Sequence, residues 1–377
     1  MAVKMMNILI DRVEFENKGS ELMLRTIVIE LQKSDQLYQI VLPRGVYLQN
    51  IGYCVENNIL PLYGKLNSVK SKIYHRVFKR HPYILPSEID VILDAAGLRF
   101  TDEARLYYKN DTENLKKYYQ SFTKPSLKIF FLPQSFGPFK EDWSQQQIKI
   151  VFNKAAYLYP REQISLAHLQ EVFGRTTKIA VAPDFTCLYK PDVPMAKLLP
   201  LNTAIIIVPN TRMITHGQSE DGEYMLFLKS IVQNLIDKRE QVILLNHQGD
   251  ADEKILLDLN TSLSVQLPIL TNLNAIEVKA IIGRAKLLIS SRFHGVVSGL
   301  SQGVPTLCTG WSHKYGELLK DYEMSSICQL NIGDIESSYQ VVLEALECPE
   351  NYRPNQMIIE TLENRSKQMF KEVFEKM

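Results

Sequence analysis

Residues 286–295, KLLISSRFHG, join a short apolar run to a polar loop, and this order of residues recurs along the chain. The same change occurs at residues 7–21, 89–97 and 127–138, and again at 204–212. Apolar runs of four to six residues, each followed by a polar loop and an amphipathic helix, are typical of parallel sheets that helices cover on both faces. The pattern therefore predicts an α/β protein.

A looser stretch at 190–201 contains three prolines and divides the pattern into two blocks. We expect one Rossmann-like domain at 1–190 and a second at 202–377, with parallel sheets that face a central cleft. Residues 178–181 are expected to form a strand, and Ser20 is the expected N-cap of the first helix. Apolar residues at helical spacing predict a C-terminal amphipathic helix over 355–377.

Composition limits the classes of function. The 377 residues include 43 Lys+Arg and 42 Asp+Glu, a net charge of +1, which argues against a nucleic-acid partner. Five cysteines without a CxxC pair predict reduced thiols in a cytoplasm rather than a zinc or redox pair. The first apolar run is too short for a signal peptide, and no run of about 18 apolar residues occurs. We therefore expect a cytoplasmic protein.

One strongly basic segment, residues 65–81, interleaves Lys, Arg and His with apolar residues at helical spacing. Such a segment is a candidate for peripheral contact with anionic lipid on the inner face of the membrane, or with a polyprenyl diphosphate. The alternative is a solvated helix face that packs its apolar side on the domain.

In open α/β sheets, ligands bind outside the carboxyl ends of the strands. Polar side chains in the loops at these ends are therefore candidates for a binding cleft. Those that we assign to this cleft are Asn17, Glu21, Gln134, Asn210 and His247.

Residues 290–295 form the densest polar cluster, between an apolar strand and a helix. Helix N-termini attract anions, and Arg292 adds a bidentate donor for carboxylate or phosphate. His294 adds a proton donor whose pKa a bound dianion would raise. The alternative reading is a helix cap at His294 and a surface ion pair at Arg292.

Three further side chains complete the candidate site. Arg161 and Lys314 are cations in loops after strands, and the alternatives are a surface ion pair and a solvated lysine. Asp94 ends a fully apolar run and is the leading candidate base, with a turn cap as the alternative. The chain lacks GxGxxG, GxxxxGK[ST], HExxH and GxSxG, so the sequence does not support P-loop nucleotide hydrolysis, a catalytic metal or a nucleophile elbow.

These motifs together give the chain a family likeness. It resembles the polysaccharide pyruvyl transferases over nearly its whole length. The matching pieces, in chain order, are Asn17-x-Gly19-x-Glu21, LPQSFGPF at 132–139, Pro160-Arg161-Glu162, Ala182-Pro183-Asp184, Pro209-Asn210-x-Arg212, SSRFHG at 290–295, Gly303-Val304-Pro305 and Lys314-Tyr315-Gly316.

The resemblance implies a glycosyltransferase-B-like fold and transfer of pyruvate from phosphoenolpyruvate to two hydroxyls of a sugar. The product would be a cyclic ketal on a bacterial surface polysaccharide, such as a capsule or exopolysaccharide, or on its lipid-linked precursor. The family's arginine and histidine carry over to Arg292 and His294, and its upstream arginine to Arg161. Arg161, Arg292 and Lys314 would bind the donor, with His294 as the acid and Asp94 as the base. The likeness also implies an acceptor side at 1–190 and a phosphoenolpyruvate side at 202–377, so the cleft residues are candidates for acceptor binding. Such a transfer needs no metal and no organic cofactor.

Two other functions fit the same pattern. A nucleotide-sugar-dependent glycosyltransferase has the same two-domain architecture and differs in its donor. A glycan- or anion-binding protein without catalysis would keep the fold and bind without turnover.

Overall fold

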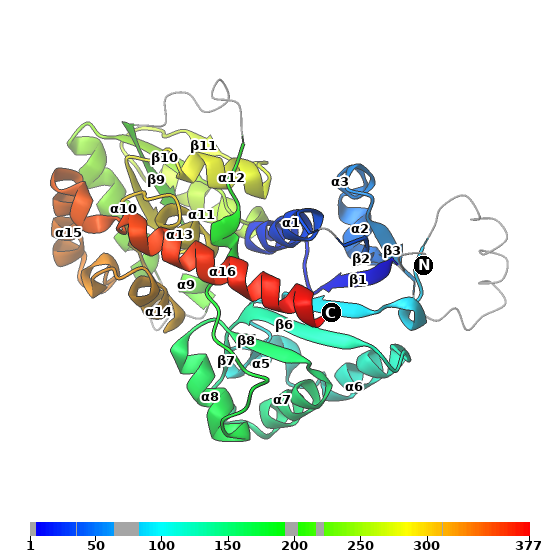
Figure 1. Ribbon diagram of the computed structural model, residues 1–377. Helices are drawn as coiled ribbons and strands as arrows, with labels where there is room; N and C mark the ends of the chain where they lie inside the picture. Colours follow the sequence, from blue (N-terminus) through cyan, green and yellow to red (C-terminus); the bar gives the residue numbers. More distant parts are fainter. Residues whose placement is uncertain (1–4, 35, 64–82, 193–202, 216–221, 311) are drawn as a thin grey trace. The chain divides into compact units, whose positions relative to one another are not determined.

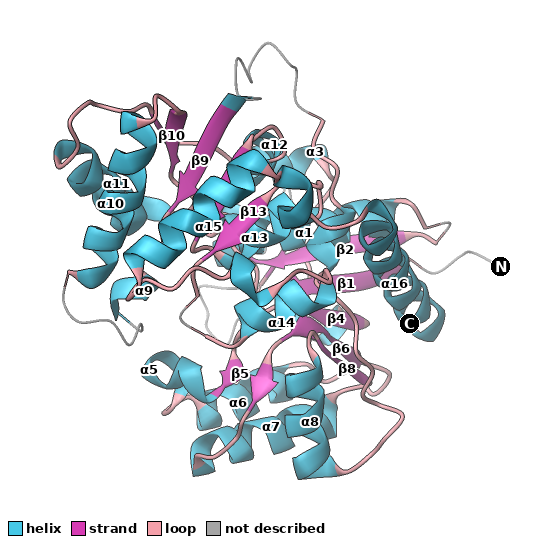
Figure 2. Cartoon of the chain, turned by 90° about the vertical axis from the view of Figure 1, so that its left-hand side faces the viewer, coloured by secondary structure: helices cyan, strands magenta, loops and turns pink. Residues whose placement is uncertain are grey.

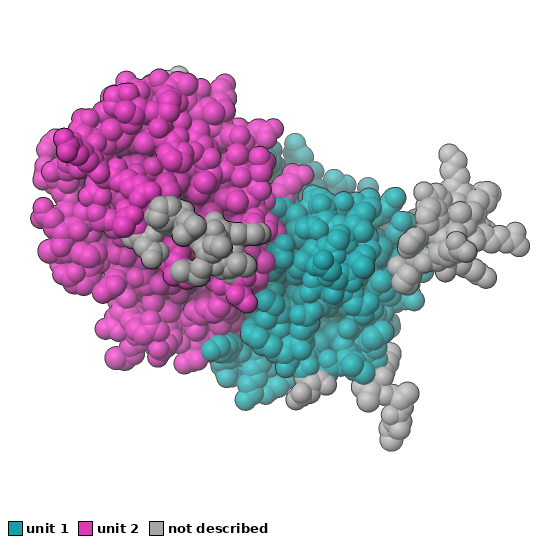
Figure 3. All heavy atoms as spheres, turned by 90° about the horizontal axis from the view of Figure 1, so that it is seen from above, with its two compact units in different colours: residues 1–15, 23–184, 367–377 teal, residues 16–22, 185–366 magenta. Residues whose placement is uncertain are grey.

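The computed structural model describes residues 5–34, 36–63, 83–192, 203–215, 222–310 and 312–377, so the basic segment at 65–81 lies outside the described residues. The chain forms two compact units (Figure 3). Unit 1 comprises residues 1–15, 23–184 and 367–377, and unit 2 comprises residues 16–22 and 185–366.

This division differs from the expected domains 1–190 and 202–377. The boundary falls between Asp184 and Phe185, residues 16–22 belong to unit 2, and residues 367–377 belong to unit 1. Prolines mark a loop, whereas contacts made far along the chain define a compact unit. In unit 1, for example, the ammonium of Lys128 donates to the carbonyl oxygen of Lys376 at 2.6 Å.

Unit 1 contains a six-stranded parallel sheet in the order β3-β2-β1-β4-β6-β8 (Figure 1). The pairing of β1 with β4 places Asp11 beside Asp94 at the carboxyl ends of both strands. Two short strands, β5 and β7, pair separately. The strands are β1 (Met6–Asp11), β2 (Tyr38–Pro43), β3 (Leu60–Leu62), β4 (Val91–Asp94), β5 (Phe100–Thr101), β6 (Lys128–Gln134), β7 (Phe136–Gly137) and β8 (Tyr157–Pro160).

The expected strand at 178–181 is present only as an irregular extended segment. It pairs with β8 through a parallel bridge between Ile179 and Leu158. The backbone N–H of Leu158 donates to the carbonyl oxygen of Lys178, and that of Ala180 donates to the carbonyl oxygen of Leu158. The helices are α1 (Lys18–Gln32), whose first turn lies in unit 2, α2 (Arg44–Gln49), α3 (Ile51–Glu56), α5 (Arg105–Tyr108), α6 (Thr112–Ser121), α7 (Asp142–Lys154) and α8 (Gln163–Phe173).

Unit 2 contains a five-stranded parallel sheet in the order β11-β10-β9-β12-β13, with helices around it (Figure 2). Its strands are β9 (Ala204–Val208), β10 (Gln241–Leu245), β11 (Ile269–Leu270), β12 (Leu287–Ser290) and β13 (Thr306–Cys308). Its helices are α9 (Arg212–Thr215), α10 (Glu223–Asp237), α11 (Gly249–Thr261), α12 (Ala275–Ile282), α13 (Phe293–Leu300), α14 (Lys314–Asp321) and α15 (Ile335–Glu347).

The strands at the centre of both sheets are wholly buried, as continuous apolar runs predict. Every residue of β9 and of β4 is buried, the terminal Asp94 included. The expected C-terminal helix is confirmed as α16 (Gln356–Lys376), which starts in unit 2 and ends in unit 1. No helix among the described residues is long and apolar enough to cross a membrane. The α/β class and the parallel sheets are thus confirmed.

Candidate functional site

Arg292 lies in the loop after β12 and is the N-cap of α13. Its Nε donates to Oδ2 of Asp252 at 2.7 Å, and one terminal nitrogen donates to Oδ1 of the same carboxylate. The other terminal nitrogen donates to Oε1 of Gln248. The Arg292 side chain is 11% exposed and that of Asp252 is fully buried, so this ion pair is an interior one rather than the surface pair considered above.

Asp252 is itself held in place. Its Oδ1 accepts hydrogen bonds from the backbone N–H of Thr211 at 3.1 Å and from the Thr211 hydroxyl at 2.8 Å. The guanidinium of Arg292 is therefore fixed in orientation, and most of its charge is balanced by Asp252. Each terminal nitrogen still keeps one N–H that makes no hydrogen bond within the described part of the chain, and both can donate to a ligand.

The backbone next to Arg292 is equally well fixed. The carbonyl oxygen of Ser291 accepts from Nδ2 of Asn210 at 2.8 Å and from the hydroxyl of Tyr315 at 2.7 Å. The Ser291 hydroxyl lies 2.6 Å from both the Tyr224 hydroxyl and the Thr309 hydroxyl. Asn210, expected in the acceptor site or the cleft, thus uses its side chain to hold this loop.

His294 is the second residue of α13, and its ring packs edge-on against that of Phe293 with centroids 5.4 Å apart. On another side lies the backbone of Gly19 in the first turn of α1. A Cβ added to Gly19 would lie 2.1 Å from Nδ1 of His294 and 2.6 Å from its Cγ. The imidazole therefore occupies space that only a glycine at position 19 leaves open.

The start of α1 differs from the expectation. The N-cap role expected of Ser20 falls to Asn17, whose Oδ1 accepts from the backbone N–H groups of Gly19 and Ser20 at 3.0 and 3.2 Å. Glu21 is buried, and its Oε2 accepts the backbone N–H of Ala275 at the start of α12. Asn17 and Glu21, both expected in the acceptor site or the cleft, thus anchor the first turn of α1 within unit 2.

His247 follows β10 and is 4% exposed. Burial lowers its pKa well below the ordinary value of 6.5, and the charges of Arg292, His294 and Lys18 lower that pKa further. Its Nδ1 has no hydrogen-bond partner among the residues that the structure describes. His247 therefore belongs with the Arg292 loop and the first turn of α1.

Lys314 begins α14 and is buried, rather than solvated. Its Nζ lies 5.9 Å from the ring centroid of Phe293 and 5.7 Å from that of Tyr315. Phe293 lies between Arg292 and His294 in sequence. The contact of Lys314 with its ring therefore adds a cation to this region. We call the group Lys18, His247, Arg292, His294 and Lys314 the unit 2 basic cluster.

In unit 1 a second polar cluster lies at the carboxyl ends of β1, β4 and β6. Nε of Arg12 lies 2.7 Å from Oδ2 of Asp94 and 3.8 Å from Oδ2 of Asp11. Tyr118 donates to Asp11 at 2.7 Å, and Gln134 donates to Asp94 at 3.2 Å. Burial raises the pKa of Asp94, whereas Arg12 beside it opposes that rise. We call these five residues the unit 1 acidic cluster.

Arg161 follows β8 and is buried in unit 1. One terminal nitrogen donates to Oδ2 of Asp184 at 3.2 Å, the other donates to the Ser135 hydroxyl at 3.0 Å, and Nε lies 3.6 Å from Oε2 of Glu162. Its backbone N–H donates to the carbonyl oxygen of Gln134. Arg161 belongs to unit 1 and Arg292 to unit 2, and their expected grouping in one donor site stays a prediction.

Sequence reasoning missed the partners of these charges. Asp252, Gln248 and Lys18 in unit 2 were not expected in the site, nor were Asp11 and Arg12 in unit 1. A signal was present in each case. Gln248 and Asp252 flank the first turn of the helix after β10, and Asp11 and Arg12 directly end the first apolar run.

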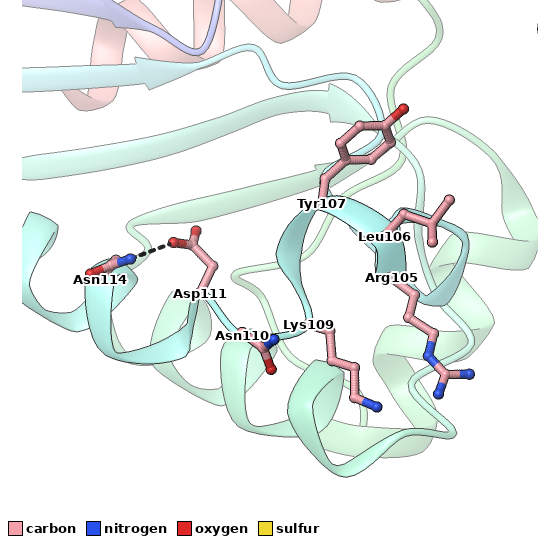
Figure 4. Close-up of a pocket in the computed structure, with 7 residues that line it drawn as sticks. All are labelled: Arg105, Leu106, Tyr107, Lys109, Asn110, Asp111 and Asn114. Atoms are coloured by element: carbon pink, nitrogen blue, oxygen red, sulfur yellow. Dashed lines mark hydrogen bonds between the residues drawn. The ribbon is translucent and has the colours of Figure 1, made fainter.

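A hollow in unit 1 lies apart from the predicted site residues. This hollow, of about 450 Å³ beside α5, is lined by residues 105–107, 109–111 and 114, none of which is a predicted site residue. Figure 4 shows that the side chain of Tyr107 points to one side of α5, whereas those of Arg105 and Lys109 point to the other. Among the described residues, no group of three or more His, Cys, Asp or Glu side chains is placed to hold a metal ion.

Solved structures define the class of fold. UDP-GlcNAc 2-epimerase from Neisseria meningitidis is similar with a TM-score of 0.58 and 11% identity, covering 98% of this chain and 100% of that one. A glycosyltransferase from Rickettsia africae is similar with a TM-score of 0.57 and 12% identity, covering 99% and 98%. The fold is therefore that of the glycosyltransferase-B class, which includes glycosyltransferases and nucleotide-sugar epimerases.

Sequence comparison then gives the family. The model of the polysaccharide pyruvyl transferases matches residues 17–313, so the chain belongs to this family of transferases that act on polysaccharide. The amylovoran biosynthesis protein AmsJ of Erwinia amylovora is 22% identical over 380 residues, covering 88% of this chain and 90% of that protein. The matched range includes Arg161, Arg292 and His294.

Proposed function

We propose that the protein transfers pyruvate from phosphoenolpyruvate to two hydroxyls of a sugar, on a bacterial surface polysaccharide or its lipid-linked precursor. The observation that carries this proposal is the unit 2 basic cluster. Phosphoenolpyruvate bears a carboxylate and a phosphate, and a site for it needs several donors held close together. Arg292 is fixed by Asp252 yet keeps two N–H groups for a ligand, and His294 lies two residues further along the chain.

The chemistry assigns His294 as the acid. It donates a proton to the methylene carbon of the enol, and C2 becomes electrophilic. One sugar hydroxyl attacks C2 and loses its proton, and a second hydroxyl then displaces phosphate, which closes the ketal ring. A matched acid contributes about 10²- to 10⁴-fold to such a step.

The unit 1 acidic cluster supports a base at Asp94. A carboxylate whose pKa is raised by burial is a stronger proton acceptor than a solvated one. Arg161 and Lys314 complete the donor site in this proposal. The reaction takes place in the cytoplasm, on an acceptor that can be linked to polyprenyl diphosphate, and it requires no metal.

The first test compares ligand-induced thermal stabilisation by phosphoenolpyruvate with that by a panel of UDP-sugars. A ligand at about 100 times its Kd adds roughly 2.7 kcal/mol to the free energy of unfolding. We expect phosphoenolpyruvate to stabilise the wild type and not Arg292→Ala. Arg12→Ala is the matched control, because it also removes an arginine that pairs with a buried aspartate and should keep the response to phosphoenolpyruvate.

Turnover is then measured as phosphate release in the presence of candidate glycan acceptors. The product should gain the mass of pyruvate less one water and should release pyruvate in acid. Stabilisation by a UDP-sugar, with none by phosphoenolpyruvate, would contradict the proposal and favour glycosyl transfer.

A further inference from the structure

His247 has a buried polar atom that nothing in the described structure satisfies. Its Nδ1 is shielded from solvent and makes no hydrogen bond within the described ranges. A buried polar atom left without a partner costs about 1–3 kcal/mol, and such atoms in native proteins usually have a reason. A partner from outside the chain, supplied when a ligand binds, is one such reason.

The surroundings of His247 indicate the charge of that partner. Lys18 in the first turn of α1, Arg292 in the loop after β12, and His294 in α13 each act on it with positive charge. Two acids also face this region, since Asp252 pairs with Arg292 and Glu21 lies 3.7 Å from Lys18. Burial, followed by the positive charges around it, lowers the pKa of His247 and keeps its imidazole neutral at neutral pH. An anionic oxygen is the ligand atom that suits a site with these surroundings.

Three segments besides the loop of His247, namely the first turn of α1, the loop after β12 and the start of α13, thus contribute positive charge around its imidazole. The two N–H groups that Arg292 keeps, one on each terminal nitrogen, match the two oxygens of a carboxylate. The imidazole of His247 and the ammonium of Lys18 lie on other segments of unit 2 and extend the donor set beyond that carboxylate.

We propose that Nδ1 of His247 donates a hydrogen bond to a phosphate oxygen of the donor substrate, and that Lys18 supplies charge to the same phosphate. His247 is then a donor-binding residue, rather than part of the acceptor site or the cleft. The identity of the phosphate as that of phosphoenolpyruvate rests on the proposed function.

The test uses two variants of the full chain. His247→Leu removes the polar atom, and His247→Asn places an amide N–H near the position of Nδ1. We expect His247→Leu to weaken binding of phosphoenolpyruvate and of inorganic phosphate by about 10- to 100-fold in calorimetry, because a hydrogen bond to a charged group is lost. His247→Asn should stay within about threefold of the wild type.

A second readout separates binding from a structural role. Without ligand, His247→Leu should melt at the same or a higher temperature than the wild type, because the variant removes an unsatisfied polar atom. A melting temperature that falls in both variants, with unchanged affinity for phosphate, would overturn the proposal.

A third readout uses the wild-type protein and therefore does not depend on whether a variant folds. In wild-type protein with ¹⁵N-labelled histidine, inorganic phosphate should shift the imidazole resonances of His247. The resonances of His168, whose Nδ1 lies at hydrogen-bond distance, 3.0 Å, from the carbonyl oxygen of Phe136, should stay unchanged. Absence of a shift at saturating phosphate and phosphoenolpyruvate would overturn the proposal. Phosphate binding that depends on His247, in a protein that transfers no pyruvate, would instead keep this inference and reject the proposed function.

Discussion

The two units each contain an arginine paired with a buried aspartate at the carboxyl edge of a parallel sheet. In unit 1, Arg12 pairs with Asp94 and lies near Asp11, so acids outnumber bases. In unit 2, Arg292 pairs with Asp252, while Lys18, His247 and His294 surround the pair. An arginine–aspartate pair is therefore part of an acidic cluster in unit 1, and a second pair of the same kind is part of a basic cluster in unit 2.

This difference shows that the neighbours, and not the arginine itself, decide what each cluster can bind. A paired arginine contributes oriented N–H groups with little net charge. Net attraction for an anion in unit 2 comes from the other cations, and its absence in unit 1 leaves a carboxylate that can accept a proton. Breaking each pair separately tests this account.

The largest effect is expected from Asp252→Asn. Arg292 would stay buried among cations without its carboxylate, and removing one partner of a buried pair costs about 3–5 kcal/mol. Asp94→Asn should cost about 1 kcal/mol or less, because burial already disfavours that charge and Arg12 keeps Asp11 nearby. Hydrogen–deuterium exchange by mass spectrometry can measure each unit separately.

Phosphate provides the control for this comparison. Saturating inorganic phosphate should restore part of the lost protection in Asp252→Asn, because the anion replaces the missing negative charge, and should leave Asp94→Asn unchanged. Equal losses in the two variants, with no response to phosphate, would show that the surrounding charges do not matter.

The next effect concerns catalysis. His294→Ala should lower turnover by at least about 100-fold, equivalent to about 2.7 kcal/mol of the barrier, while binding of phosphoenolpyruvate largely survives. Steady-state kinetics and calorimetry check the two parts. Turnover near that of the wild type would remove His294 as the acid.

A smaller loss of turnover is expected from Gly19→Ala. The added Cβ overlaps the imidazole of His294 and must displace it, so kcat should fall by about 10-fold at little change in KM for phosphoenolpyruvate. The helix itself should gain stability, since alanine is favoured over glycine by about 1 kcal/mol. In the His294→Ala background, the same change should have no further effect on kcat.

Gly52→Ala is the matched control for this variant. Gly52 also lies in a helix, α3, and the nearest atom to an added Cβ there is Oδ1 of Asn50 at 3.9 Å. It should gain helix stability without loss of kcat. If Gly19→Ala behaves in the same way, the contact with His294 does not position the imidazole.

Much of the fold could be predicted because the central strands are buried on both faces. Such strands form continuous apolar runs, as in residues 204–208 and 242–245, and those runs are visible without knowledge of their partners. Short outer strands such as β3 and β11 have too few residues to form a pattern. The expected boundary at 190–201 depended on prolines in the sequence, which could not show that residues 16–22 belong to unit 2.

The site could be predicted only in part, for a related reason. Arg292 and His294 lie two residues apart in sequence and follow a strand, so their local pattern is sufficient to mark them as candidates. Asp252 is forty residues from Arg292, and its role depends on a pairing across the sheet edge. Gly19 carries no chemistry of its own, and its contact with His294 becomes apparent only in three dimensions.

The smallest expected effect is a difference between the units in their response to pH. The folded-state pKa of His247 lies well below 6.5, so the unfolded chain takes up this proton first as the pH falls below about 6.5. His247 therefore lowers the stability of unit 2 by about 1 kcal/mol at pH 5.5. The contribution of Asp94 to stability changes with pH in the opposite direction. Its pKa is raised, so the folded chain takes up that proton first, and the contribution to the stability of unit 1 becomes more favourable as the pH falls.

Protection factors measured at pH 7.5 and 5.5, corrected for intrinsic exchange, should therefore decrease more in unit 2 than in unit 1 as the pH falls. The excess loss should disappear in His247→Asn, and its persistence in that variant would assign it to another group.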